Sequence, residues 1–472
     1  MRRPAATPVV LAAMAAFAVG YAALSVLRRR AFVTGRFDLG NMVQAVWSTA
    51  HGHPLQMTNL HGAQSSRLAA HVDPILALFG PLWWIWPSPD LLLVVQAAAL
   101  ATGAWAVFLL ARKHLASARA ALGFALAYLL YPATGWLTLN EFHPVALATP
   151  LLLFAFWYLD NNRLLPFALC AVAAAACKEE IGLVVAGMGA WYALSHRRWA
   201  AGAAIVALGI AWSAIAIGIV IPHYHATGES DFYGRYSEVG GSAPGIVKTT
   251  LTDPGRIFDA AFSTRDLRYL LELVAPLAAL CLLAPLVLIA ALPELAINLL
   301  SATPTQTSIH FHYTAGLIPP LVVAAVLGAK RLNRRTTPVA AAVVIAAVLG
   351  NYLLGPIPGW RHVPGGEHYQ ATAARVTEHD RIAARALALI PKSAVVSATN
   401  TLGAHLSARK RVLSFPFIQD ATWIAADETQ PGYADRYAPV PTAIQLAELR
   451  RNSDWRLVFE QDGVLIFNRP QA

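Results

Sequence analysis

Charged residues are scarce in this sequence, at 13% of 472 positions, whereas 57% of the residues are hydrophobic. A soluble domain usually carries about 25% charged residues. Apolar runs close to the length of about 20 residues that a bilayer requires recur as far as about Leu354. Because lipid offers the backbone no hydrogen-bond partners, such runs predict helices that cross a membrane. A soluble all-helical core is disfavoured, since buried soluble helices usually keep a polar stripe.

The sequence also lacks the motifs of several functional classes. It has no Gly-x-x-x-x-Gly-Lys-Ser/Thr phosphate loop, which argues against ATP-driven transport by this chain alone. It has no Asp-x-Asp of the kind that soluble nucleotide-sugar transferases use for a metal–diphosphate. Its three cysteines lie inside apolar runs and are interpreted as small core residues, not as a disulfide set or a metal site.

The net charge of +10 does not indicate a nucleic-acid partner. The basic residues form short clusters between apolar runs instead of a continuous stripe. Clusters of this kind are typical of the cytoplasmic loops of membrane proteins. We therefore expect membrane lipids, and no nucleic acid, among the partners.

The apolar runs predict an all-α polytopic membrane protein with about eleven spans. Two regions are ambiguous, because charged residues at 178–180 interrupt one long run and only two prolines break another. Each is interpreted as two short spans or a re-entrant pair. A Trp-rich segment at 71–87 predicts a helix on the membrane surface. The predicted spans lie near residues 8–27, 91–111, 119–134, 144–159, 164–178, 180–194, 199–221, 269–285, 286–301, 314–329 and 337–354.

The distribution of basic residues predicts the orientation in the cell membrane. The first apolar run resembles a signal peptide, but its length favours a retained span. With a cytoplasmic N-terminus, the short inner loops are dense in basic residues, although Arg28-Arg29-Arg30 would then lie outside. The outer face receives loops 28–90 and 222–268. The basic residues of the inner loops are Arg2, Arg3, Arg112, Lys113, Arg119, Arg163, Arg197, Arg198, Lys330, Arg331, Arg334 and Arg335.

The chain changes character after the last span, which predicts a transmembrane domain over 1–354 and a small extracytoplasmic α/β domain over 355–472. Helical spacing covers 375–390, and two short strands are expected at 394–397 and 411–414. Two apolar stretches on either side of Asp462-Gly463 predict a β-hairpin.

Acidic residues and histidines gather on the expected outer side. Asp38 follows the first span and is interpreted either as a helix cap or as a catalytic carboxylate. Asn140-Glu141-Phe142-His143-Pro144 joins two spans, and its Glu141 and His143 would bind a metal or relay a proton. A polar turn before a helix that starts at a proline is the alternative.

Two further clusters complete the candidate site. Lys178-Glu179-Glu180 is either a charged group at a cavity or a solvated hairpin tip. His310-Phe311-His312-Tyr313 precedes a span, and two histidines serve as metal ligands only with a third ligand nearby. A divalent metal is therefore one hypothesis, and its expected ligands are Asp38, Glu141, His143, His310 and His312.

These motifs together resemble a family of predicted bacterial multi-span membrane proteins that is classified as a domain of unknown function. The resemblance rests on Phe37-Asp38-Leu39-Gly40, the segment 71–76, Asn140 to Pro144, Lys178-Glu179-Glu180 and His312-Tyr313, and it extends to 397–406 in the tail. That family is similar to the GT-C glycosyltransferases, which take a sugar from a polyprenyl-phosphate carrier on the outer face. In GT-C enzymes an acid in the first outer loop is catalytic or binds a metal, and Asp38 matches it by position.

The resemblance implies a membrane glycosyltransferase with a polyprenyl-phosphate sugar lipid as donor and a glycan or envelope acceptor. Many GT-C enzymes carry two adjacent acids, whereas Leu39 follows Asp38 here, so Asp38 is left as base, metal ligand or cap. Glu141 and His143 are the other expected catalytic residues. A transporter or flippase of lipid-linked sugars, or a non-catalytic envelope-assembly protein, are the alternatives. The expected substrate-binding residues are Arg36, Lys178, Glu179, Glu180, His312 and Tyr313.

Overall fold

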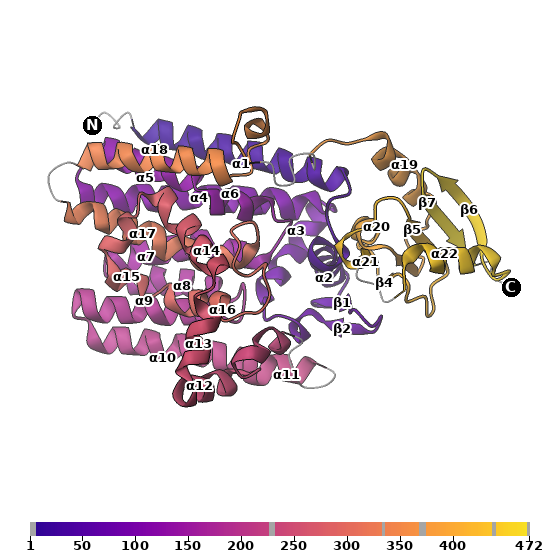
Figure 1. Ribbon diagram of the computed structural model, residues 1–472, viewed down its shortest axis with the longest axis horizontal. Coiled ribbons are helices and arrows are strands. Elements are labelled where there is room, and N and C mark those ends of the chain that lie inside the picture. The colour runs from indigo at the N-terminus through magenta and orange to yellow at the C-terminus, as the bar shows by residue number, and fades with distance from the viewer. Residues whose placement is uncertain (1–5, 226–231, 333–335, 368–373, 437–439, 470–472) are drawn as a thin grey trace.

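The computed structural model describes residues 6–225, 232–332, 336–367, 374–436 and 440–469. A helical bundle makes up most of the protein, and a smaller domain with a β-sheet lies at one end of it (Figure 1). The bundle begins with α1 (Ala6–Arg30), and the sheet domain contains the C-terminal strands. This arrangement confirms the mostly helical fold with a small C-terminal sheet region.

Four described helices are long and apolar enough to cross a membrane: α1, α4 (Asp90–Leu115), the stretch Trp199–Tyr224 that contains α10, η4 and α11, and α18 (Thr336–Leu354). A fifth span is present if α5 (Ala118–Leu130) and α6 (Pro132–Leu139) count together, although they meet at 45°. Pro132 lacks the amide hydrogen that a continuous helix would need there, which explains the bend. The predicted count of eleven spans is not confirmed.

Shorter apolar helices fill the rest of the bundle. They are α7 (Pro144–Asp160), α8 (Leu164–Ala175), α9 (Ile181–His196) and α17 (Ile318–Arg331). The interruption predicted at 178–180 is present, because α8 ends before it and α9 begins after it. The region 269–301 is also broken, into α14 (Thr264–Val274), η6 (Ala275–Leu277), η7 (Leu280–Leu283), α15 (Pro285–Leu288) and α16 (Leu292–Leu299).

Small residues let α9 and α10 (Trp199–Ile215) pack closely. A Cβ atom on Gly182 would lie 2.5 Å from the main-chain oxygen of Gly209, and one on Gly202 would lie 2.7 Å from that of Gly189. In each helix the two glycines are seven residues apart and therefore share a face. Helix pairs in membranes use small residues in this way, because dispersion contacts replace the missing hydrophobic driving force.

Several short elements lie between the bundle and the sheet domain. The segment 28–90, which the sequence predicts to be the first outer loop, contains a single π-helical turn η1 (Arg36–Gly40), α2 (Asn41–Ala50), the hairpin β1–β2 (Gln56–Thr58 and Gln64–Ser66), η2 (Arg67–Ala69), η3 (Pro74–Leu78) and α3 (Phe79–Ile85). The helix predicted within 71–87 is therefore present, and Trp84 and Ile85 are exposed on it. The second outer loop contains η5 (Tyr233–Val239), α12 (Ala243–Thr252) and α13 (Pro254–Ala261).

The C-terminal domain is a five-stranded sheet in the order β4-β3-β5-β7-β6. The predicted strands are present as β3 (Val396–Ala398) and β4 (Val412–Ser414), and the predicted hairpin is β6 (Arg456–Gln461) with β7 (Val464–Asn468). Sequence patterns missed β5 (Trp423–Asp427), which pairs parallel to β3 and antiparallel to β7. The helices are α19 (Glu378–Leu387), α20 (Asn400–His405), α21 (Tyr433–Arg436) and α22 (Thr442–Arg451).

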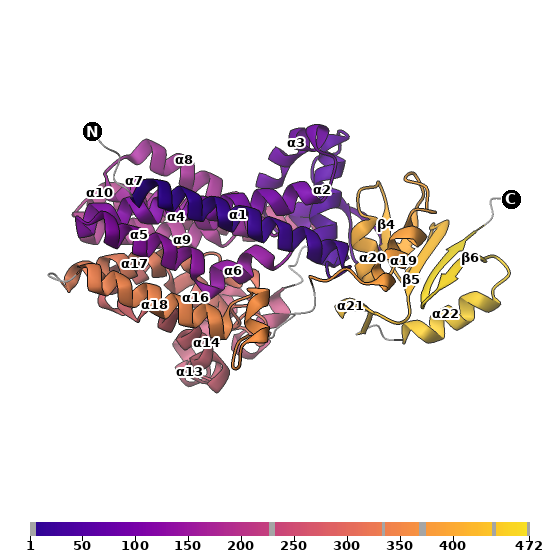
Figure 2. The same ribbon diagram turned by 90° about the horizontal axis from the view of Figure 1, so that it is seen from above.

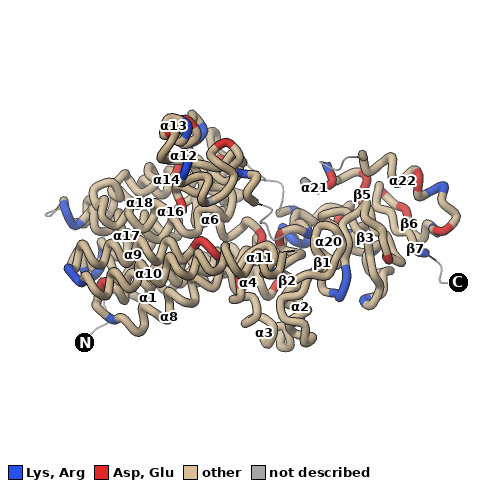
Figure 3. The backbone as a smooth tube through the Cα atoms, turned by 90° about the horizontal axis from the view of Figure 1, so that it is seen from below, with Lys and Arg blue, Asp and Glu red and all other residues tan. Residues whose placement is uncertain are grey.

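The C-terminal domain contacts the end of α1 and the first outer loop (Figure 2). The His405 ring stacks on Phe32 at 3.9 Å and its Nε2 donates to the main-chain oxygen of Arg29. Gln419 donates to the main-chain oxygen of His61 at 2.7 Å. Lys and Arg residues gather at the opposite end of the bundle (Figure 3).

Candidate functional site

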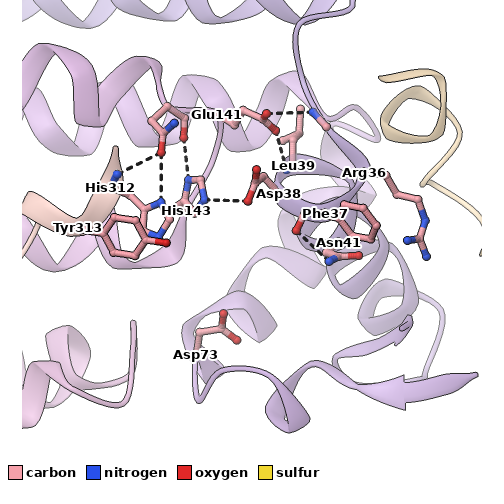
Figure 4. A network of polar contacts seen from close by, with 12 residues as sticks. Arg36, Phe37, Asp38, Leu39, Asn41, Asp73, Glu141, His143, His312 and Tyr313 are labelled. Atoms are coloured by element: carbon pink, nitrogen blue, oxygen red, sulfur yellow. Dashed lines mark hydrogen bonds and ion pairs between the residues drawn. The ribbon is translucent and has the colours of Figure 1, made fainter. Parts of the chain in front are cut away.

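Asp38 lies in the π-helical turn η1, which the carboxylate of Glu141 holds in place. The amide of Gly35 donates to Oε1 of Glu141 at 2.9 Å, and the amide of Leu39 donates to Oε2 at 2.9 Å. Both amides are among the donors that a helix start leaves without an internal partner. Glu141 therefore caps the turn from a loop that is 102 positions from Leu39 in the chain. Both of its carboxylate oxygens face main-chain donors (Figure 4).

His143 faces Asp38 across this junction. Its Nε2 lies 3.4 Å from Oδ1 of Asp38, and its Nδ1 lies 2.7 Å from the main-chain oxygen of Asn140. Because a carbonyl oxygen only accepts, Nδ1 carries a hydrogen. The contact between Nε2 and a carboxylate oxygen is attractive only if a proton lies between them. Asp38 and His143 therefore share one proton.

The surroundings of Asp38 favour its ionised form. Desolvation acts to raise the pKa of Asp38, but only weakly because the side chain is about half exposed; the hydrogen bond and charge of His143, with the more distant charges of Arg67 and His71, hold the pKa below its usual value. The Asp38 side chain is 53% exposed, whereas that of His143 is 8% exposed. The pair thus presents an ionised, accessible carboxylate beside a buried imidazole ring.

His312 stacks on His143, which brings a third candidate residue to the same place. The two rings are parallel within 18° and their centroids are 3.8 Å apart. The main-chain amide and Nδ1 of His312 lie 3.1 and 3.2 Å from Oδ1 of Asn140. Burial, followed by the charge of His143, holds the pKa of His312 well below its usual value. The lowered pKa favours a neutral His312 ring where it stacks on His143.

Two cations flank the next residue, Tyr313. Lys178 Nζ lies 5.5 Å and the Arg235 guanidinium 5.9 Å from the centre of its ring, and Arg235 donates to its hydroxyl at 3.3 Å. Both distances are within the range of cation–π attraction. Lys178 also forms an ion pair with Glu180 at 2.5 Å. Positive charge is therefore gathered one residue away from His312.

Glu179 points elsewhere, into the first outer loop. It pairs with Nδ1 of His71 at 2.8 Å and accepts the amide of Val72 at 2.9 Å. The His71 ring in turn stacks on Phe232 at 4.6 Å. Glu179 thus ties the interruption between α8 and α9 to two outer loops.

Arg36 does not face Asp38, although the two residues are close in the chain. Its guanidinium is buried and donates to Oγ of Ser414 and to the main-chain oxygens of Val412 and Thr58. Figure 4 shows its side chain directed away from the Asp38–His143 pair. Arg36, an expected substrate-binding residue, therefore has its guanidinium bound to the protein itself.

The five expected metal ligands are only partly brought together. Asp38, His143 and His312 are neighbours, but Glu141 has both oxygens on main-chain amides. His310 contacts Trp136 and Ser308. Among the described residues, no three His, Cys, Asp or Glu side chains are grouped to hold a metal ion. The divalent metal stays a prediction, which metal analysis of the purified protein tests.

Sequence reasoning missed Gln96 and Arg235. Gln96 lies within the apolar helix α4, donates to the main-chain oxygens of Leu137, Thr138 and Glu141, and accepts the amide of His143. A lone buried amide inside a predicted span was the signal for it, because polar groups at that depth require partners. Arg235 lies in η5, and nothing in the spacing of the sequence indicates its contact with Tyr313.

Comparisons with known proteins agree with this fold. Residues 28–466 match the model of a family described as "Predicted membrane protein (DUF2079)". The structure is similar to the crystal structure of ArnT from Cupriavidus metallidurans in the apo state, with a TM-score of 0.53 and 12% identity, over 96% of this chain and 99% of that chain. ArnT is a GT-C glycosyltransferase, so the GT-C-like resemblance is confirmed at the level of fold. No curated protein sequence matches the chain.

Proposed function

Because the chain belongs to the DUF2079 family of predicted membrane proteins and has a GT-C-like fold, we propose that it is a membrane glycosyltransferase that uses a polyprenyl-phosphate-linked sugar on the outer face. The observation that carries this proposal is the Asp38–His143 pair, an accessible carboxylate 3.4 Å from the ring nitrogen of a buried histidine. Its position in the first outer loop matches that of the acid in GT-C enzymes.

In the proposed reaction an acceptor hydroxyl attacks the anomeric carbon of the donor sugar. Asp38 takes the hydroxyl proton as the new C–O bond forms, and the bond between the anomeric carbon and the phosphate oxygen breaks. Polyprenyl phosphate leaves, and the sugar is transferred with inversion. His143 keeps Asp38 ionised and in place before the reaction, and the hydroxyl proton ends on Asp38.

The leaving phosphate gains negative charge in this step and needs a nearby cation. Lys178 and Arg235, on either side of Tyr313, are the candidates. Glu180 already neutralises much of the charge of Lys178. Arg235 therefore replaces Arg36 as the preferred partner of Lys178 in this role.

The proposed orientation puts the C-terminal domain and the first outer loop outside the cell. Lys and Arg gather at the far end of the bundle (Figure 3), as the positive-inside rule requires of a cytoplasmic end. A transporter or an assembly protein would not require Asp38, His143 and His312 to converge, so their contacts favour the transferase.

Purified protein in detergent tests the proposal by release of polyprenyl phosphate from a panel of lipid-linked sugars. Asp38→Asn should abolish release, while thermal stability stays close to wild type. The matched control is Asp420→Asn, since Asp420 is also about half exposed, at 57%, but pairs with Arg411 in the C-terminal domain. Equal release by wild type and Asp38→Asn, or no release from any donor, would shift the assignment to transport or binding.

A further inference from the structure

The segment Gly35–Gly40 that carries Asp38 is held from two sides. Glu141 accepts two of its amides from the bundle side. On the other side Oδ1 of Asn400, the first residue of α20, accepts the amide of Arg36 at 2.9 Å. The C-terminal domain thus makes a direct hydrogen bond to the backbone two residues from the proposed catalytic carboxylate.

This contact is tightly fitted. A Cβ atom on Gly35 would lie 2.8 Å from Nδ2 of Asn400, and one on Gly40 would lie 2.7 Å from Oγ of Ser407. A side chain at Gly35 would therefore displace the side chain of Asn400, and one at Gly40 would displace that of Ser407 and crowd the Cα atom of Ala404 in α20, 3.3 Å away. The side chain of Arg36 adds hydrogen bonds to Ser414 and Val412 in the neighbouring strand β4.

Asn400 is itself held within its own domain. Its main-chain amide donates to both carboxylate oxygens of Asp435, at 2.9 and 3.1 Å, and the amide of Gly432 donates to Oδ2 of Asp435 at 2.8 Å. Asp435 therefore sets where the Asn400 side chain lies, and Asn400 sets where the amide of Arg36 lies.

We propose that Asn400 is a positioning residue for Asp38, so that the C-terminal domain forms part of the catalytic site of the bundle. The inference rests on the proposed function, because it assigns Asp38 a chemical role. Its physical basis is that a carboxylate in a single π-helical turn moves with the backbone, and both ends of this turn are set by side chains outside it. A domain that only binds acceptor would need no hydrogen bond to this segment.

The experiment compares Asn400→Leu, which removes the acceptor at similar size, with Asn400→Asp, which keeps an acceptor oxygen at the same place. The matched control is Gln419→Leu, because Gln419 also joins the two domains by a hydrogen bond, to His61, but does not contact the Asp38 segment. With donor in the release assay, Asn400→Leu should lower kcat roughly tenfold to a hundredfold at unchanged KM. Asn400→Asp should recover most of it, and Gln419→Leu should retain wild-type kcat.

A second readout does not depend on glycosyl transfer. A thiol introduced by Asp38→Cys in a Cys170→Ser background is labelled with a water-soluble maleimide; the other cysteines, Cys177 and Cys281, are buried. Asn400→Leu should change the labelling rate severalfold, whereas Asn400→Asp and Gln419→Leu should not. An unchanged rate in Asn400→Leu, or an equal change in Gln419→Leu, overturns the proposal. If the labelling rate changes only in Asn400→Leu, and neither wild type nor any variant releases polyprenyl phosphate, the positioning contact is supported and the transferase assignment is rejected.

Discussion

Glu141→Gln separates a structural role for Glu141 from a chemical one. In the structure the two carboxylate oxygens accept the amides of Gly35 and Leu39, each at 2.9 Å. Glutamine offers one oxygen and one NH₂ group, so one of these amides would face a donor. The variant should therefore lose one hydrogen bond completely and the charge assistance of the other.

The size of the effect follows from the partner lost. A hydrogen bond to a charged group contributes about 1.5–3 kcal/mol, so the free energy of unfolding should fall by about 2–3 kcal/mol. At ~2 cal/mol/K of unfolding entropy per residue, this corresponds to about 2–3 °C in Tm for a chain of this length. Release of polyprenyl phosphate should fall together with Tm, because the turn that carries Asp38 is loosened.

The measurement is thermal unfolding in detergent beside the donor-release assay, with Glu378→Gln as the control. Glu378 is 63% exposed and pairs with Arg381 on the surface of α19, so its replacement should leave Tm close to the wild-type value. A Glu141→Gln protein with unchanged Tm and no release would refute the capping role and restore Glu141 as a group that acts in the chemistry.

Three further variants test the electrostatics. His143→Gln should raise the pKa of Asp38, because the hydrogen bond and charge of His143 lower it; the acid limb of kcat/KM for donor release should move to higher pH, and an unmoved limb would contradict this. Burial and the charge of Arg29 lower the pKa of His405 to about 3. Between about pH 6.5 and this value the unfolded state binds the proton and the folded state does not, so His405 should lower the free energy of unfolding by about 1.4 kcal/mol for each pH unit of acidification. Melting curves between pH 7 and 5 should fall less steeply in His405→Gln than in wild type, because other histidines of lowered pKa, such as His312, contribute in both proteins. Arg235→Gln should lower kcat for donor release about tenfold or more, and steady-state kinetics with wild-type values would remove Arg235 from the phosphate site.

Local patterns were enough to predict much of the fold. The hairpin at Asp462-Gly463 was predictable, since Asp-Gly between two apolar stretches favours a tight turn, and both residues have the positive φ that such a turn requires. The interruption at 178–180 was predictable because charges rarely continue an apolar span. Strand β5 was missed, although its residues are mostly buried, because a short buried run has no alternation that distinguishes it from a helix.

The candidate site was predictable as a set of residues but not as a set of contacts. Residue type and position in the outer loops selected Asp38, His143 and His312, which the structure brings together. The direction of the Arg36 side chain depends on Val412, which is 376 positions away in the chain. The capping by Glu141 depends on Leu39, which is 102 positions away. No spacing rule within a loop reports such partners.

The long separation between Arg36 and Asn400 in the chain also sets a minimum delay, during biosynthesis, between the synthesis of Arg36 and the formation of this contact. The contact between Arg36 and Asn400 spans 364 positions, which a ribosome adds in about 20–70 s at ~5–20 residues per second. Throughout that interval the bundle segments enter the membrane while the turn that carries Asp38 lacks its second support. On the proposed assignment, a nascent chain consumes lipid-linked sugar only slowly until its last domain has folded, and a chain truncated before residue 400 draws on the donor pool at least about tenfold more slowly than the full chain.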